Sequence, residues 1–225
     1  MSTHPPAEWL RRLVMLGVPP AIAILELWHV YPSGPDLYHA LSHQPALWKM
    51  LHIIQLPLFG LAAYAVYLLT ADLGGGAAKV SRLGLGVFVI FYTALDAIIG
   101  IGVGTLIRAG QQLPPEQQEG VARAIYQLAI DPVAGGTFPS LLPMLGTLGW
   151  LAGGLGAAYA LYKEGSPRPP LIFLALSSLI LIAGHPRPFG PLAFGCLFVA
   201  TLWLELAGRG AAVRRGRARD VREQG

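Results

Sequence analysis

Six stretches of the chain are apolar over the length of a membrane-crossing helix, or nearly so, and polar clusters separate them. They are residues 13–31, 46–69, 83–107, 141–162, 171–184 and 189–207. A helix needs about 20 mostly apolar residues to cross the hydrocarbon core of a bilayer. The stretch 171–184 is shorter than that, and the other five approach or exceed it. The pattern therefore predicts an all-α bundle of six transmembrane helices.

One further segment, 114–130, is polar on one side and apolar on the other. Pro114 and Pro115 open it, and Glu116 and Glu119 lie in its first turn, where the helix dipole favours acidic side chains. Its apolar face consists of Val121, Ile125, Leu128 and Ala129. We therefore expect an amphipathic helix that lies on the outer surface of the membrane.

The composition excludes most other classes of protein. Hydrophobic residues make up 54% of the 225 residues, charged residues 12%, and the mean hydropathy is +0.54. A soluble domain is nearer 25% charged, and a disordered chain is far less apolar. The single cysteine, Cys196, rules out a disulfide scaffold. An integral membrane protein remains, with the lipid bilayer as its first partner.

The basic residues predict the orientation of the chain. With six spans, twelve of the sixteen Lys and Arg residues lie on the side of the N-terminus, and Lys49, Arg108, Arg123 and Arg187 lie on the other. Because cytoplasmic loops carry the excess of Lys and Arg, both termini should be cytoplasmic. We expect a cytoplasmic N-terminus (1–12), a transmembrane domain (13–207) and a basic tail (208–225), in a bacterial cytoplasmic membrane. The tail should contact lipid headgroups rather than nucleic acid.

Several polar residues lie within the predicted spans, where they are costly unless they have a function. At 1.5 Å per helical residue, Glu26 and His52 lie roughly 9 and 10 Å below the outer boundary. Gln55 and Asp96 lie roughly 15 and 18 Å below it. We expect these four side chains to form a polar column that faces the interior of the bundle.

Histidines add metal-binding chemistry to this column. His29 and His185 lie at the outer ends of their spans, so His29, His52 and His185 are the candidate ligands of zinc, copper or haem iron. Glu26 and His29 have the Glu-x-x-His spacing of di-metal bundles, but the motif occurs once, which argues against a complete di-iron centre. An outward-facing His/carboxylate site for redox or binding chemistry is the first hypothesis for function.

The entrance to this site should lie among the outer loops. His39 and His43 are in one such loop, and the helix 114–130 together with the corner 185–188 would form a lid over the site.

Two alternatives remain open. Asp96, flanked by Tyr92 and Thr93, could carry the proton of a proton-coupled solute transporter. The chain could also be an accessory subunit of a membrane complex or a homo-oligomer, because it has almost no soluble domain.

His52, Asp96 and His185 also resemble, faintly, the zinc site of membrane hydrolases of the alkaline-ceramidase and adiponectin-receptor kind. That resemblance implies a zinc-dependent hydrolase. Those families have seven helices and a late His-x-x-x-His pair, and this sequence has neither. Their site residues are therefore not carried over.

Small residues predict where helices touch. Gly100 and Gly104 are four residues apart, as are Gly149 and Gly153, and such pairs let two backbones approach closely in lipid. We expect the helices of 83–107 and 141–162 to pack through these glycines.

Overall fold

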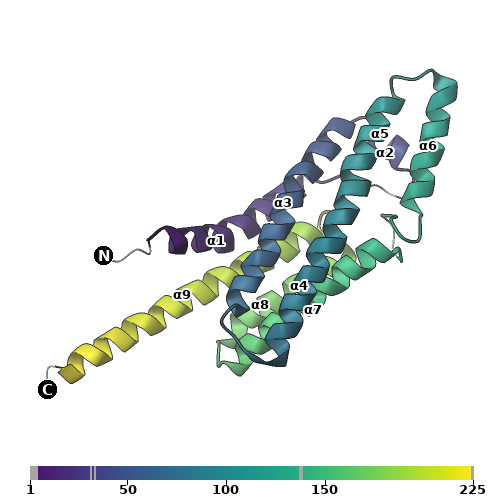
Figure 1. The fold of residues 1–225 in the computed structure, drawn as a ribbon. Coiled ribbons are helices and arrows are strands. Elements are labelled where there is room, and N and C mark those ends of the chain that lie inside the picture. The colour runs from purple at the N-terminus through teal and green to yellow at the C-terminus, as the bar shows by residue number, and fades with distance from the viewer. Residues whose placement is uncertain (1–4, 31, 33, 137–138, 224–225) are drawn as a thin grey trace.

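Every regular element among the described residues is a helix (Figure 1). The computed structural model describes residues 5–30, 32, 34–136 and 139–223, and of 5–7 and 208–223 only the backbone. The helices are α1 (Pro5–Leu27), α2 (Leu37–Leu41), α3 (Pro45–Thr70), α4 (Gly75–Leu95), the π-helix η1 (Asp96–Gly102), α5 (Val103–Gly110), α6 (Pro115–Ala129), α7 (Leu141–Lys163), α8 (Arg168–Ile180), the 3-10 helix η2 (Leu181–Ala183) and α9 (Phe189–Glu223). The predicted all-α class is confirmed.

Within the described part of the chain, four helical segments, not six, are long and apolar enough to cross a membrane. They are Pro45–Thr70, Gly75–Gly110, Leu141–Lys163 and Phe189–Ala207. The first predicted span falls short because only thirteen residues separate Arg12 from Glu26 in α1. The fifth falls short because the helix Arg168–Ala183 is only sixteen residues long. The prediction of six spanning helices is thus wrong for these two.

The helices α4 and α7 touch backbone to backbone. A Cβ added to Gly149 would lie 2.5 Å from the Phe88 amide nitrogen, and one added to Gly84 would lie 2.7 Å from the Gly149 carbonyl oxygen. The predicted packing through Gly149 and Gly153 is therefore correct. The expected partners Gly100 and Gly104 are wrong, because both face α3 instead.

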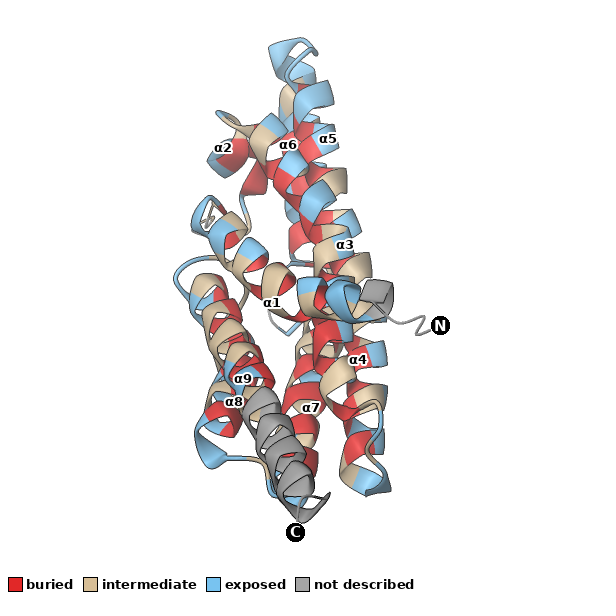
Figure 2. Cartoon of the chain, turned by 90° about the vertical axis from the view of Figure 1, so that its left-hand side faces the viewer, coloured by how far each residue is buried: buried red, intermediate tan, exposed pale blue. Residues whose placement is uncertain are grey.

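The long helix formed by α4, η1 and α5 runs beside α3 through the molecule (Figure 1). At its far end α2, α5 and α6 pack together, and α1, α8 and α9 form a second group at the side. The predicted amphipathic helix is found as α6, which buries Ala122, Ile125 and Ala129. Red, buried residues follow the inward faces of these helices (Figure 2).

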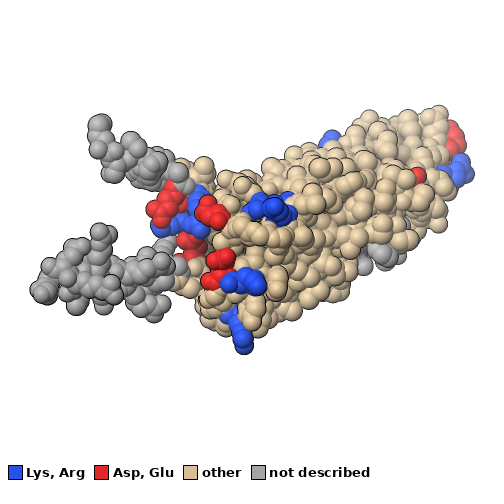
Figure 3. Space-filling model, turned by 60° about the horizontal axis from the view of Figure 1, so that its bottom comes forward, with Lys and Arg blue, Asp and Glu red and all other residues tan. Residues whose placement is uncertain are grey.

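Charged side chains gather mainly at one end of the molecule, with a smaller group at the other and a mostly tan face between them (Figure 3). A hollow lined by Arg11, Asp72, Glu164 and Glu205 brings the start of α1, two turns and the middle of α9 together. In it Arg11 and Glu205 form an ion pair of 2.5 Å. Large apolar side chains face outward along the helices, Leu83 with 72% of its surface exposed. Exposed apolar area on this scale is typical of a surface that is covered by lipid or protein.

Candidate metal centre

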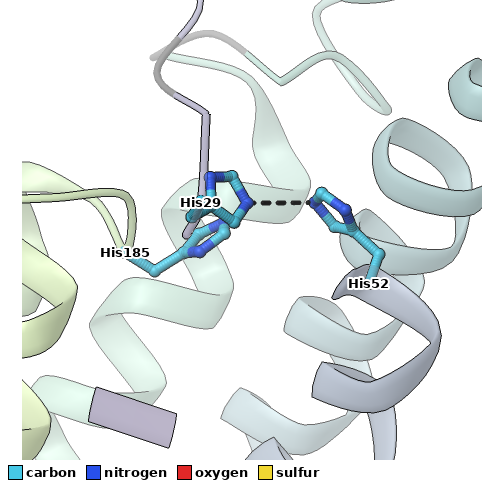
Figure 4. Close-up of side chains that lie close together, drawn as sticks. All are labelled: His29, His52 and His185. Atoms are coloured by element: carbon cyan, nitrogen blue, oxygen red, sulfur yellow. Dashed lines mark hydrogen bonds between the residues drawn. The ribbon is translucent and has the colours of Figure 1, made fainter. Parts of the chain in front are cut away.

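Three histidines that are far apart in the sequence meet inside the bundle (Figure 4). His29 follows the end of α1, His52 lies in the second turn of α3, and His185 lies in the corner between η2 and α9. One ring nitrogen from each lies within 4.8 Å of those of the other two. His29 and His52 are buried and His185 is largely so. The sequence named all three as ligands but did not show that they share one place.

Hydrogen bonds fix how the first two rings are turned. The Nδ1–H of His29 donates to the Val30 carbonyl oxygen at 2.8 Å, and that of His52 donates to the Trp48 carbonyl oxygen at 2.7 Å. With Nδ1 protonated, the neutral ring carries a lone pair on Nε2. The two Nε2 atoms lie 3.4 Å apart and face each other. Two lone pairs at this distance repel unless a proton or a cation lies between them.

The third ring is oriented by a buried carboxylate. Nδ1 of His185 donates to Glu26 at 3.1 Å from Oε1, and the Gln55 side-chain amide donates to the same oxygen at 2.8 Å. Burial disfavours the charged imidazole, but the charge of Glu26 and the hydrogen bond to it outweigh burial and raise the pKa of His185. A histidine that ligates a metal typically donates its other N–H to a carboxylate in this way.

Asp96 approaches the histidines from the first residue of η1. Its Oδ1 lies 3.7 Å from Nε2 of His52, and its Oδ2 is buried without a hydrogen-bond partner in the described structure. A short π-helix within an α-helix is frequent at functional sites because it changes which side chains point inward. Here it brings a carboxylate against the histidines.

Two glycines make room for the rings. A Cβ added to Gly100 of η1 would overlap the imidazole of His52, and one added to Gly190 would overlap the backbone carbonyl of His185. The indole of Trp48 also bonds η1, donating to the Ile99 carbonyl oxygen at 3.2 Å. The position of His52 therefore depends on the contact between α3 and η1.

A cavity of about 720 Å³ lies beside the centre. Its wall includes all three histidines and Asp96, together with side chains of α4, α7 and the corner after η2. This volume is within the range of pockets that hold small molecules.

Hydrogen bonds and close contacts, together with the proximity of His185 to His29 and His52, bring the candidate residues into one connected group: Glu26, His29, His52, Gln55, Asp96 and His185. The loop that precedes and carries the expected entrance residues does line the cavity, through Pro32, Gly34, Pro35 and Leu37. His39 bonds Asp36 at 2.9 Å at the surface, His43 is exposed, and neither lines the cavity. The expected lid contributes Ala129, His185 and Pro186 to the wall.

The sequence did not predict the roles of Trp48 and Gly100. The Trp48 carbonyl oxygen accepts a hydrogen bond from the His52 ring, and Gly100 leaves space for that ring because it has no side chain. The Trp-x-x-x-His spacing was visible, since residues four apart share a helix face, but the partner of Gly100 was not.

No family model matches the chain, and neither a curated protein nor a solved structure does. Its chemistry must be inferred from the residues of the centre themselves.

Proposed function

We propose that the chain is an integral membrane protein that binds one divalent transition-metal ion through His29, His52 and His185. The observation that carries this is the pair of Nε2 atoms that face each other at 3.4 Å while both Nδ1 atoms donate to backbone carbonyls. Neutral imidazoles turned in this way present two ligand atoms to one point.

The spacing favours a tetrahedral ion such as zinc. Two nitrogens bound at 2.0–2.1 Å to a tetrahedral ion lie about 3.3 Å apart, which is close to the separation of His29 and His52. Haem fits less well. Its axial ligands lie on opposite faces of the porphyrin, and a third ring nitrogen within 4.8 Å of both others leaves no room for the macrocycle.

The buried charges also favour a cation. Glu26 and Asp96 are buried, and their hydrogen bonds and ion pairs within the described chain are with histidine and glutamine only. Buried carboxylates need compensation, which a divalent ion provides. Asp96 is placed to complete the metal shell or to bond a water in the fourth position.

The apolar surface supports insertion in a membrane. Four helical segments have the length and hydropathy of spans, and large apolar side chains face outward between two charged ends. The twelve-to-four count assumed six full spans, but the basic residues still favour this orientation, because Arg11 and Arg12 pair with Glu205, directly before the basic stretch 208–225. We therefore propose that this end is cytoplasmic and that the metal centre lies in the outer half of the membrane.

Elemental analysis of purified protein tests the metal. After reconstitution with zinc or cobalt, the unaltered chain should hold about one equivalent, and His52→Ala should hold almost none. The matched control is His39→Ala, which removes a surface histidine and should leave the metal content unchanged. Equal content in the two variants would show that His52 is not a ligand, and no metal in the unaltered chain would overturn the proposed metal centre.

A further inference from the structure

The cavity beside the metal centre is polar at one end and apolar over most of its wall. The polar end of the cavity is formed by Tyr92 and by the residues of the centre that line the cavity, which are His29, His52, Asp96 and His185. The other polar side chains of the wall, among the described residues, are Thr147 and the indole of Trp48. Trp48 already donates to the Ile99 carbonyl. A ligand that fills this space therefore has a polar head and an apolar body.

Two large apolar side chains among the described residues belong both to the cavity wall and to the outer surface. Leu148 of α7 is 51% exposed, and Ile182 of η2 is 53% exposed. Leu148 lies seven residues from the start of α7, which is about 10 Å along the helix axis. If α7 begins at the outer boundary of the membrane, as the proposed orientation requires, an exposed side chain at that depth would meet lipid, and the wall between α7 and η2 would border the hydrocarbon of the bilayer.

Irregular backbone lies at the same place. The chain leaves α8 through η2 and turns at Gly184, which has φ 107°, and residues 182–186 all line the cavity. Non-helical backbone at membrane depth is tolerated where it is buried in protein or lines a cavity. Exposed wall residues and non-helical backbone therefore coincide between α7 and η2, beneath the outer loop 32–37 that also lines the cavity.

The charges of the metal centre favour one kind of polar head group in the ligand. A divalent ion with neutral imidazoles is balanced by the carboxylates of Glu26 and Asp96, so a neutral head fits better than a carboxylate or a phosphate. Oδ2 of Asp96 is buried without a partner in the described structure and accepts from an O–H or N–H. The open metal position takes an oxygen.

We propose that the cavity takes a neutral single-chain lipid with a hydroxyl or amide head, which enters from the bilayer between α7 and η2. The head lies at the metal and Asp96, and the chain lies along the apolar wall. This proposal rests on the proposed metal centre for the position of the head.

Photolabelling in vesicles tests the proposal. Zinc-loaded protein is reconstituted in phosphatidylcholine with hexadecanol that carries a diazirine in mid-chain, and labelled peptides are mapped by mass spectrometry. We expect labels on wall residues of the cavity that are buried from the outer surface, Leu95 and Ile99. Leu148→Trp should lower this labelling at least fivefold by filling the entrance. The control Leu155→Trp, two turns along the exposed face of α7 and outside the cavity, should not.

The preference for a neutral head group is tested with hexadecanoic acid that carries the same diazirine. It should label the cavity at least fivefold less than the alcohol does. Equal labelling by the acid would overturn the neutral head, and cavity labelling that Leu148→Trp leaves unchanged would overturn the side entrance.

Elemental analysis of the same samples separates the two proposals. Metal-loaded protein labelled only on its outer faces overturns the lipid cavity and leaves the metal centre standing. Cavity labelling in protein that binds no metal overturns the metal centre and supports the lipid cavity.

Discussion

Glu26 accepts a hydrogen bond from Nδ1 of His185 and so orients the ring. A substitution of Glu26 therefore tests the effect of ligand orientation on metal affinity while the ligand itself remains. Glu26→Gln keeps the shape of the side chain and an oxygen acceptor but removes the charge behind Nδ1. Loss of such a supporting group typically lowers metal affinity about 10- to 100-fold. We expect that decrease in a competition titration with a chelator, with about one equivalent still bound at saturating metal.

Glu205→Gln is the matched control, because Glu205 is also buried but pairs with Arg11 at the other end of the molecule. Its metal affinity should equal that of the unaltered chain. An equal decrease in both variants would indicate a general loss of structure, and no decrease in Glu26→Gln would remove Glu26 from the centre.

Individual residues of the centre could be predicted from their cost in lipid, but their contacts could not. Glu26, His52 and Asp96 could be identified because each is an ionisable residue within an apolar segment, where such residues are costly. Depth counted along each helix separately placed His29 well above His52, whereas their Nε2 atoms lie 3.4 Å apart. Such counting assumes that every helix crosses the whole membrane in the same direction.

At the scale of elements, this difference is explained by the two helices that do not qualify as spans: α1, whose apolar stretch lies between Arg12 and Glu26, and α8 with η2, which has only sixteen residues. α1 ends at Leu27, and α8 with η2 ends at Ala183, while α3 and the α4–η1–α5 helix continue past them. The C-terminal ends of α1 and η2 therefore lie inside the bundle and place His29 and His185 beside His52. A hydropathy pattern gives the length of an apolar run, but not the level at which its helix stops.

The π-helix η1 allows a sharp test of how two elements build the centre. In Gly100→Ala the new methyl group would overlap the His52 ring, so the ring must move and metal affinity should fall at least 10-fold. Gly102→Ala lies in the same π-helix, but its added Cβ would have only an ordinary contact, 3.5 Å from the Ala97 carbonyl oxygen. We expect near-normal affinity there, measured by the same chelator titration.

Equal effects of the two alanines would mean that η1 tolerates no side chain at either position, whatever happens to His52. An unchanged metal affinity in Gly100→Ala would contradict the close contact between the His52 ring and η1.

At the scale of the whole molecule, the length of one helix sets how the protein sits in a bilayer. The helix Gly75–Gly110 has 36 residues and is about 54 Å long, whereas the hydrocarbon core is about 30 Å thick. Part of it must therefore emerge, and the end that packs with α2 and α6 carries the smaller group of predicted outer charges. We therefore expect the centre to lie below that projecting end, in the outer half of the membrane.

Cysteine labelling tests this placement. With Cys196 replaced by alanine, Gly74→Cys marks the turn before α4, and Gln117→Cys marks the exposed side of α6. A membrane-impermeant maleimide should label Gln117→Cys in intact cells and Gly74→Cys only after permeabilisation, because the excess of basic residues holds the turn side in the cytoplasm. The reverse pattern would invert the protein and place the metal centre on the cytoplasmic half. Labelling of both positions from one side would mean that Gly75–Gly110 does not cross the membrane, and the buried centre would then belong to a bundle that lies on the lipid surface.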